Sequence, residues 1–192
     1  CLNWCKKHKR QSILMSETRY ADGNRRWLKE RWKSHLVRKF DAAIVGGRSH
    51  ADYLVGLGLD RSKITMGYNV IDNQYFAGAA QQVRSSASKQ RPFFLASNRF
   101  VPRKNLDLAI EAFAKQVEAC GHKWDLCLLG DGPEESALLS TAQRCGLQIA
   151  RAAPWELSQA DHPTVYFPGF RQIDQLPEFY ARAGAFFHPA IS

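Results

Sequence analysis

The sequence has little that would fix it in a membrane or mark it for a common catalytic class. A membrane-spanning helix needs about 20 consecutive apolar residues, whereas the longest apolar runs, Phe93–Ala96 and Leu126–Leu129, have only the length of buried strands. There is no Walker loop, no GxGxxG dinucleotide fingerprint and no Ser/His/Asp spacing of a triad hydrolase. No signal peptide is visible, and because the chain begins with Cys1 we expect its natural start to lie upstream.

The cysteines also show no pattern of a disulfide framework or of a zinc site. The five cysteines are odd in number and scattered, without a CxxC pair or a Cys/His cluster at zinc-ligand spacing. Cys127 and Cys145 stand in apolar surroundings, which is typical of small core residues. We therefore expect no structural metal and a reducing, cytoplasmic location, with peripheral contact at the inner face of a membrane as an option.

Positive charge, by contrast, is abundant and unevenly distributed. The formal net charge is +9; residues 1–50 hold 13 Lys/Arg and 4 Asp/Glu, whereas residues 51–192 hold 14 of each. A basic segment of this kind indicates an anionic partner such as a membrane surface, a phosphorylated acceptor or a nucleic acid. A solvated helix face that only aids solubility explains the same pattern, so charge alone leaves both interpretations open.

Short apolar strands alternate with helices of 3.6-residue periodicity, which predicts an α/β fold of parallel βαβ units. In the helix over 24–39 we expect the stripe of Trp27 and Trp32 to face inward. Ser49, with Asp52 three residues later, fits a capping box for the next helix. The strands are predicted at 12–16, 42–45, 64–66, 93–97, 125–129, 164–167 and 185–188, and the helices at 24–39, 49–57, 105–117, 133–145 and 176–182.

The alternation is interrupted at residues 77–91, which are small and polar with little periodicity. We interpret them as a linker loop at a domain junction, between a first domain of residues 1–76 and a second of residues 92–192. A further loop is expected at 150–163. Because a parallel strand needs cover on both faces and the last predicted strand has no following helix before Ser192, we expect the second domain to be incomplete in this chain.

Candidate ligand-binding residues follow the strands, because open parallel sheets bind ligands beyond the carboxyl ends of their strands. Arg99 and Lys104 bracket the loop after the strand at 93–97. The planar fork of an arginine and the mobile ammonium of a lysine can hold a diphosphate and stabilise it as a leaving group. Two solvated surface cations are the alternative interpretation.

Three further groups of residues also follow strands. The first is a glycine-rich turn that lets backbone approach a ligand closely, although an ordinary strand-to-helix turn has the same pattern. The second offers a backbone edge and an apolar side chain for contact with a nucleobase; ordinary packing in the core is the alternative interpretation. The third is a carboxylate and an imidazole in the first domain, which suit either an acceptor site or ordinary structural positions. In this order, the groups are Gly130, Asp131 and Gly132; Gly169, Phe170 and Leu176; and Glu17 and His50.

Taken in order, these segments resemble glycosyltransferase family 4, a retaining family with the two-domain GT-B fold. Residues 40–76 are similar to the end of that family's N-terminal domain and its crossing into the second domain. Residues 93–113 resemble its Arg-x4-Lys loop, residues 128–139 its GDGP turn, and residues 165–192 the run that leads into its acidic Glu-x7-Glu motif. The order and spacing of these motifs are more specific than any single one of them.

The resemblance implies two Rossmann-like domains, both incomplete here, and transfer of a hexose from a nucleoside-diphosphate sugar to the hydroxyl of a polysaccharide, lipid or small glycoside. It assigns Arg99 and Lys104 to the donor diphosphate, the groups around Gly130 and Gly169 to the nucleoside, and residues 1–70 to the acceptor side. It implies no metal or other cofactor. The acidic Glu-x7-Glu motif is expected just beyond Ser192, so the catalytic residues are unknown and the chain alone is expected to be inactive.

Two departures from the family and one rival interpretation remain. Asn98 and Asn105 stand where the family often has glycine beside its Arg and Lys, although asparagine tolerates unusual backbone angles. The rival is a non-catalytic module that binds a polyanion or a membrane surface through residues 1–50. The two functions are compatible, because transfer to a lipid-linked acceptor would benefit from a basic membrane-facing patch. We do not expect a nucleic acid as the partner.

Overall fold

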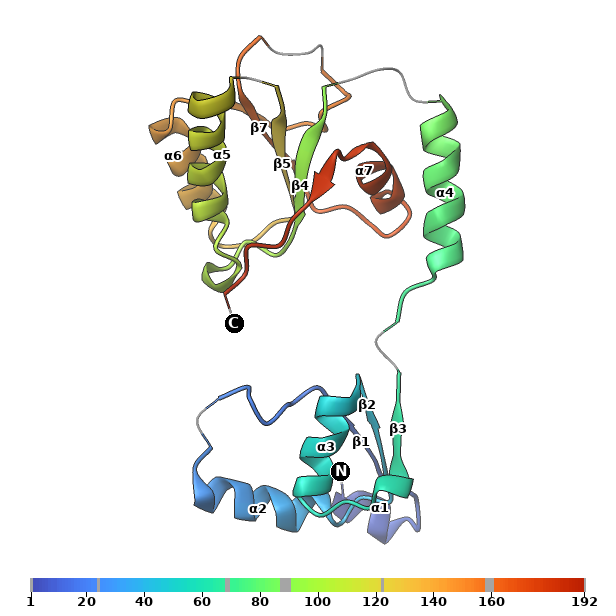
Figure 1. Cartoon of the computed structure of the whole chain (residues 1–192). Helices are drawn as coiled ribbons and strands as arrows, with labels where there is room; N and C mark the ends of the chain where they lie inside the picture. Colours follow the sequence, from blue (N-terminus) through green and yellow to red (C-terminus); the bar gives the residue numbers. More distant parts are fainter. Residues whose placement is uncertain are drawn as a thin grey trace. The chain divides into compact units, whose positions relative to one another are not determined.

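The computed structural model describes residues 2–23, 25–67, 70–86, 91–121, 123–157 and 161–191. The chain forms two compact units, which divide between Ile71 and Asp72 (Figure 1). Each unit contains a single parallel sheet with helices packed against it, so the predicted α/β fold class is confirmed.

Unit 1 is built on a three-stranded parallel sheet in the order β1-β2-β3. Ser16 lies opposite Val45 in the register of β1 and β2, and Val45 lies opposite Met66 in that of β2 and β3. The core of the unit forms where the inward residues of β2, such as Ala43 and Val45, meet the buried side of α3. The elements are α1 (Leu2–Lys7), β1 (Ile13–Ser16), α2 (Trp27–Val37), β2 (Ala42–Val45), α3 (Arg48–Gly56), a 3-10 turn (Arg61–Lys63) and β3 (Ile64–Met66).

The aromatic stripe of α2 faces solvent, contrary to the prediction. Trp27 and Trp32 are 70% and 66% exposed, and the buried residue of this helix is Val37. Polar contacts hold the opposite side of α2 near α3: the Tyr53 hydroxyl donates to Glu30 Oε2 at 2.7 Å, and Ser34 Oγ donates to the Leu57 carbonyl at 2.7 Å. Periodicity identifies a stripe but not the side that turns inward; here the inward side carries Val37 and these polar bonds.

The capping box expected in α3 does not form. This helix begins at Arg48 with Gly47 as its N-cap and has no side-chain cap bond. Asp52 instead accepts from Arg61 Nη1 at 2.6 Å, which ties α3 to the turn before β3.

Unit 2 is built on a five-stranded parallel sheet in the order β6-β7-β5-β4-β8. Helices α5 and α6 lie on one face of this sheet and α7 on the other (Figure 1). All five residues of β5 are buried, because a parallel strand in the middle of such a sheet is covered on both sides. The elements are α4 (Asn73–Ser86), β4 (Phe93–Ser97), a 3-10 turn (Pro102–Lys104), α5 (Leu106–Cys120), β5 (Asp125–Leu129), α6 (Glu135–Arg144), β6 (Gln148–Ala150), β7 (Thr164–Gly169), α7 (Leu176–Arg182) and β8 (Ala185–Phe186).

Residues 77–86, expected to be a loop, are part of helix α4, so that prediction is wrong for this stretch. The remainder of the expected linker, residues 87–90, lies outside the described residues. Helix α4 packs on α7: the rings of Phe76 and Tyr180 meet edge to face with centroids 6.3 Å apart, and Arg84 Nε donates to the Ala181 carbonyl at 3.4 Å. The helix therefore belongs to unit 2.

Candidate functional site

Three loops meet at the carboxyl edge of the five-stranded sheet, after the adjacent strands β4, β5 and β7. They surround a cavity of about 260 Å³. The sequence singled out five of its lining residues, and the fold brings these together from positions far apart in the chain. The cavity is lined by Ser97, Asn98, Arg99, Leu129, Gly130, Asp131, Phe170, Arg171 and Leu176.

Backbone hydrogen bonds join the loops to one another. The Asn98 N–H donates to the Leu129 carbonyl at 2.9 Å, and the Phe100 N–H donates to the Asp131 carbonyl at 2.6 Å. The third loop joins through the Gly130 N–H, which donates to the Gly169 carbonyl at 3.1 Å. Because these bonds satisfy main-chain groups, the wall of the cavity is part of the sheet edge and not an independent flap.

The two glycines of the Gly130–Gly132 turn are required by this packing. Gly130 has φ 135° and Gly132 has φ 152°, which is a region that residues with a Cβ rarely occupy. A Cβ at Gly130 would overlap the carbonyl oxygen of Asn98, and one at Gly132 would overlap the backbone of Phe100. The turn therefore first serves the close approach of two loops, and only Gly130 of the pair also lines the cavity.

Two arginines are among the residues that line the cavity, and the sequence pattern indicated only one of them, Arg99. Arg99 is exposed and Arg171 is half-buried. The signal for Arg171 was available, since it follows strand β7 and stands next to Phe170 at a strand's carboxyl end. The carboxylate of Asp131 is the acidic group of the lining, so the cationic groups outnumber it.

Cys127, in the strand below the cavity, is not a nucleophile. Burial raises the pKa of the Cys127 thiol far above its usual range, and the positive charge of Arg171 opposes this rise only in part. A thiol with such a pKa stays protonated at neutral pH and therefore lacks the reactive thiolate form.

Lys104 is not among the residues that line the cavity. Its Nζ lies 3.3 Å from His188 Nε2, and the Ile191 N–H donates to the Arg103 carbonyl at 3.1 Å, so its turn contacts the segment after β8. Convergence of Arg99 and Lys104 on one ligand therefore stays a prediction. Asn105, which ends this turn, has φ 54°, a left-handed conformation in which asparagine can replace glycine.

The segment after β8 is also the one that the resemblance connects to the acidic Glu-x7-Glu motif. The described part of this segment ends at Ile191, and Ser192 lies outside the described residues. The placement of the acidic motif beyond Ser192 therefore stays a prediction, and so does the expectation that the chain alone is inactive.

The two acceptor-side candidates lie in unit 1, at the carboxyl edge of its own sheet. Glu17 directly follows β1 and is exposed, and Gly46 directly follows the paired strand β2. His50 sits in the first turns of α3 with its ring close to Gly46, and its Nδ1 atom is buried without a hydrogen-bond partner among the described residues. An imidazole nitrogen without a partner is able to accept or donate one further bond.

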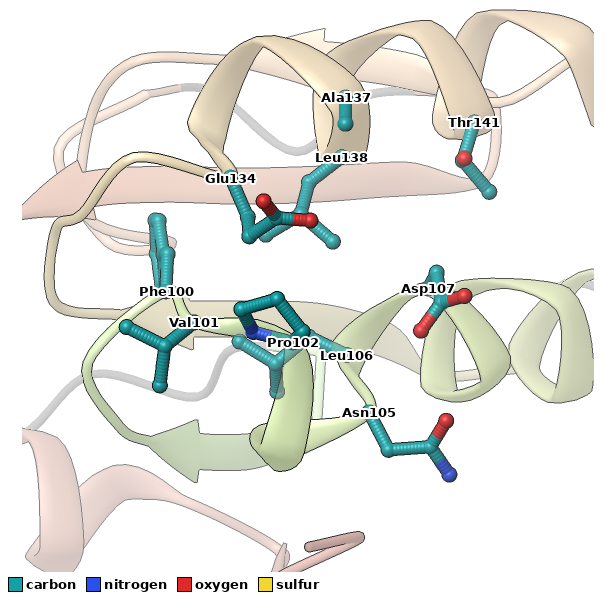
Figure 2. A pocket seen from close by; sticks show the side chains of 10 residues that line it. All are labelled: Phe100, Val101, Pro102, Asn105, Leu106, Asp107, Glu134, Ala137, Leu138 and Thr141. Carbon is teal, nitrogen blue, oxygen red and sulfur yellow. The ribbon is translucent and has the colours of Figure 1, made fainter.

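A second cavity of unit 2 lies on the other side of the Phe100 loop, between α5 and α6, with a volume of about 230 Å³. Figure 2 shows Asp107 and Glu134 on its opposing walls. Two carboxylates repel an anionic ligand, so this cavity does not suit a phosphate. A larger cavity of about 820 Å³ lies in unit 1, lined by residues such as Tyr20, Trp27 and Tyr53, and contains none of the candidate ligand-binding residues predicted from the sequence.

The described residues offer neither a metal-binding cluster nor a membrane span. No group of three or more His, Cys, Asp or Glu side chains there is arranged to hold a metal ion. Within the same ranges, no helix is both long enough and apolar enough to cross a membrane.

Comparison with known proteins relates the chain to sugar-transferring enzymes. A family model described as "Glycosyl transferases group 1" matches residues 79–192, which is more than half of the chain. Anabaena HepE, solved in complex with UDP and glucose, is similar with a TM-score of 0.64 at 16% identity, over 98% of this chain and 49% of that one. No curated protein sequence matches the chain.

A second solved structure shows the same fold. A UDP-forming α,α-trehalose-phosphate synthase from Burkholderia vietnamiensis has a TM-score of 0.64 at 12% identity, over 97% of this chain and 49% of that one. The chain thus spans about half the length of both proteins. At such low identity the likeness shows the fold alone, two Rossmann-like domains of the GT-B type, as the sequence predicted.

Proposed function

Since the chain belongs to the glycosyl transferases group 1 family, we propose that it carries the donor-binding part of an enzyme that transfers a sugar from a nucleoside-diphosphate sugar to a hydroxyl acceptor. The observation that supports this proposal is the cavity at the carboxyl edge of the five-stranded sheet, with Arg99 and Arg171 in its wall. The solved structure of HepE, which has the same fold, holds UDP and glucose. The transferred sugar is a hexose, and its anomeric configuration is retained.

The cavity supplies two kinds of contact for such a donor. The guanidinium groups offer charge-assisted hydrogen bonds to the diphosphate, which gains negative charge as the glycosidic bond breaks. Phe170 and Leu176 offer apolar surface to the nucleoside. Lys104 approaches the same diphosphate in the loaded enzyme. Because fixed cations already stabilise the leaving group, the proposed reaction needs no metal and no other cofactor.

The acceptor side is proposed for unit 1. Glu17 and His50 lie near the carboxyl ends of β1 and β2, the edge at which open parallel sheets bind ligands. A carboxylate and an imidazole can position an acceptor hydroxyl and receive its proton. The acceptor class remains a polysaccharide, a lipid or a small glycoside.

The experiment uses the full-length protein and three variants, Arg99→Ala, Lys104→Ala and Arg144→Ala. Arg144 is an exposed arginine of α6 whose side chain bonds to Glu111, and it serves as the matched control. Ligand-observed NMR against UDP-, GDP- and ADP-sugars gives donor affinity, and a coupled assay gives turnover. We expect the first two variants to bind the preferred donor at least about tenfold more weakly, since each removes a charge-assisted contact. Unchanged affinity and turnover in both would refute the grip on the diphosphate.

The alternative function is a non-catalytic module that binds a polyanion or a membrane surface through its basic first 50 residues. Their surplus of positive charge favours it specifically, because the remaining residues carry equal numbers of basic and acidic side chains. Salt-sensitive binding to a polyanion without affinity for any nucleotide sugar would favour this alternative over the enzyme.

A further inference from the structure

Helix α2 exposes three large apolar side chains to solvent. Trp27 is 70% exposed, Leu28 is 71% exposed and Trp32 is 66% exposed. Successive residues of a helix are turned by about 100°, which places these three within a sector of about 140°. Arg31 and His35 occupy the same sector and are also exposed. We call these five residues the α2 outer face.

The carboxylate of Glu30 and the guanidinium of Arg31 lie on different sides of helix α2. The acidic residue between Trp27 and Arg38 is Glu30, which points toward α3 and accepts hydrogen bonds from Lys33 Nζ at 2.9 Å and from the Tyr53 hydroxyl. On the outer face, the Arg31 guanidinium lies 5.9 Å from the centroid of the Trp27 ring. The outward side of α2 therefore combines apolar area with positive charge and presents no carboxylate of its own helix.

We propose that the α2 outer face binds the surface of a lipid bilayer that contains anionic headgroups. Tryptophan is favoured at the depth of the headgroups, where its ring is partly apolar and its N–H can find a hydrogen-bond partner. Arginine beside it, here Arg31, meets the negative surface potential and keeps its charged end in water. A helix with this arrangement lies in the plane of the interface.

A bilayer fits these residues better than a nucleic acid does. Contacts with a phosphate backbone need cations and polar groups. Such contacts would not bury the two tryptophans and the leucine that this helix face exposes. The surplus of positive charge in residues 1–50 supports the same partner at longer range, since several basic residues add to the attraction of an anionic surface. The proposal rests on unit 1 and does not depend on the donor cavity.

The test measures co-sedimentation of the full-length protein with vesicles of phosphatidylcholine, with and without 30 mol% phosphatidylglycerol (about one charged headgroup in three, enough for a strong surface potential). We expect binding to the anionic vesicles to fall at least about tenfold in a Trp27→Ala, Trp32→Ala double variant, because apolar burial is lost. A double variant of Arg31→Glu on this face and Lys29→Glu, an exposed residue of α2 that flanks it, is expected to lose at least as much. Binding of the unsubstituted protein should weaken as salt is raised.

Matched controls lie in unit 2. Leu108→Ala removes an exposed apolar side chain from α5, and Lys115→Glu with Lys123→Glu makes the same charge change at exposed positions. Both controls are expected to bind vesicles as the unsubstituted protein does. Quenching of tryptophan fluorescence by brominated lipid gives a second readout that needs no variant. Donor affinity should be unchanged in the α2 variants, so failure here is distinct from failure of the proposed function.

Three outcomes would overturn the proposal. The first is an absence of both vesicle binding and quenching in the unsubstituted protein. The second is full binding by the tryptophan variant together with competition by duplex DNA, which would make the face a general polyanion patch. The third is a dimer in sedimentation equilibrium that the tryptophan variant dissolves, which would mean that a second copy of the chain covers the face.

Discussion

At the scale of single residues, the shape of the candidate donor cavity depends on two backbones that approach more closely than side chains allow. Gly130→Ala forces a Cβ against the Asn98 carbonyl at a φ of 135°. We expect it to lower the free energy of unfolding by about 2 to 3 kcal/mol. Gly146→Ala is the control, since Gly146 has φ 69° but open space around it, and about 1 kcal/mol is expected there. Urea denaturation compares the two, and equal losses would contradict the role given to loop packing.

The second prediction at this scale concerns Arg171, which lines the same cavity as Arg99. Arg171→Ala is expected to weaken binding of the preferred nucleoside diphosphate by about tenfold, because one charge-assisted contact is lost. Arg171→Lys should restore only part of the affinity, since an ammonium lacks the planar fork. Isothermal titration with the diphosphate alone measures this. Unchanged affinity in Arg171→Ala would show that this residue does not contact the diphosphate.

At the scale of elements, helices α2 and α3 are joined by a polar network with a predictable dependence on pH. The hydrogen bond from Lys33, helped by the one from Tyr53, lowers the pKa of the Glu30 carboxyl. Because the pKa of Glu30 is lower in the folded state, its ionised carboxylate stabilises the fold at pH values above the unfolded pKa of about 4.3. This contribution is lost as pH falls through the folded pKa. Glu30→Gln should therefore lower the free energy of unfolding by about 1 kcal/mol at pH 7, because solvent screening limits the effect of the charge. The loss should become progressively smaller toward pH 3.

The measurement is urea denaturation of both proteins across this pH range. Glu118→Gln, at an exposed glutamate of α5, serves as the control and is expected to change stability by less than about 0.5 kcal/mol. A difference between Glu30→Gln and the unsubstituted protein that persists unchanged at pH 3 would show that the network does not act through the charge of Glu30.

Strands were predicted more successfully than helices. The strands at 42–45, 93–97 and 125–129 match the observed bounds, because their runs of apolar, partly or fully buried residues leave a clear pattern. The strand at 64–66 also matches, although none of its residues is fully buried. The strand β6, of three residues, was missed. Helix α4 was missed because none of its residues is fully buried: its inner side consists of partly buried residues such as Phe76, Ala79 and Val83, and the rest of its sequence is small and polar.

For the candidate site, the rule that ligands bind at the carboxyl ends of strands pointed to loops that the structure brings together, and Arg99, Asp131 and Phe170 line one cavity there. That this cavity binds the donor stays a prediction. What sequence does not give is the direction of a side chain. Lys104 follows the same loop as Arg99 but contacts His188, and the tryptophans of α2 turn outward where periodicity alone allowed either side.

At the scale of the whole molecule, the central strand of the unit 2 sheet is covered on both faces, whereas an edge strand of the unit 1 sheet is partly exposed. In unit 2 every residue of β5 is buried, whereas in unit 1 the edge strand β1 leaves Ile13 and Met15 at 56% and 63% exposure. Amides of β5 should therefore exchange with solvent deuterium most slowly, and those of β1 at least about tenfold faster. Native-state exchange followed by mass spectrometry or NMR reads this directly. Equal protection in the two strands would mean that the units open as one cooperative block.

The close approach of the loops at Asn98 and Gly130 also bears on attempts to redirect the proposed donor specificity. A directed-evolution library that randomises Gly130 or Gly132 would consist mostly of destabilised clones, since any Cβ there meets backbone. Phe170 and Arg171 line the same cavity outside the hydrophobic core, so diversity introduced there alters the recognising groups and leaves the loop packing intact.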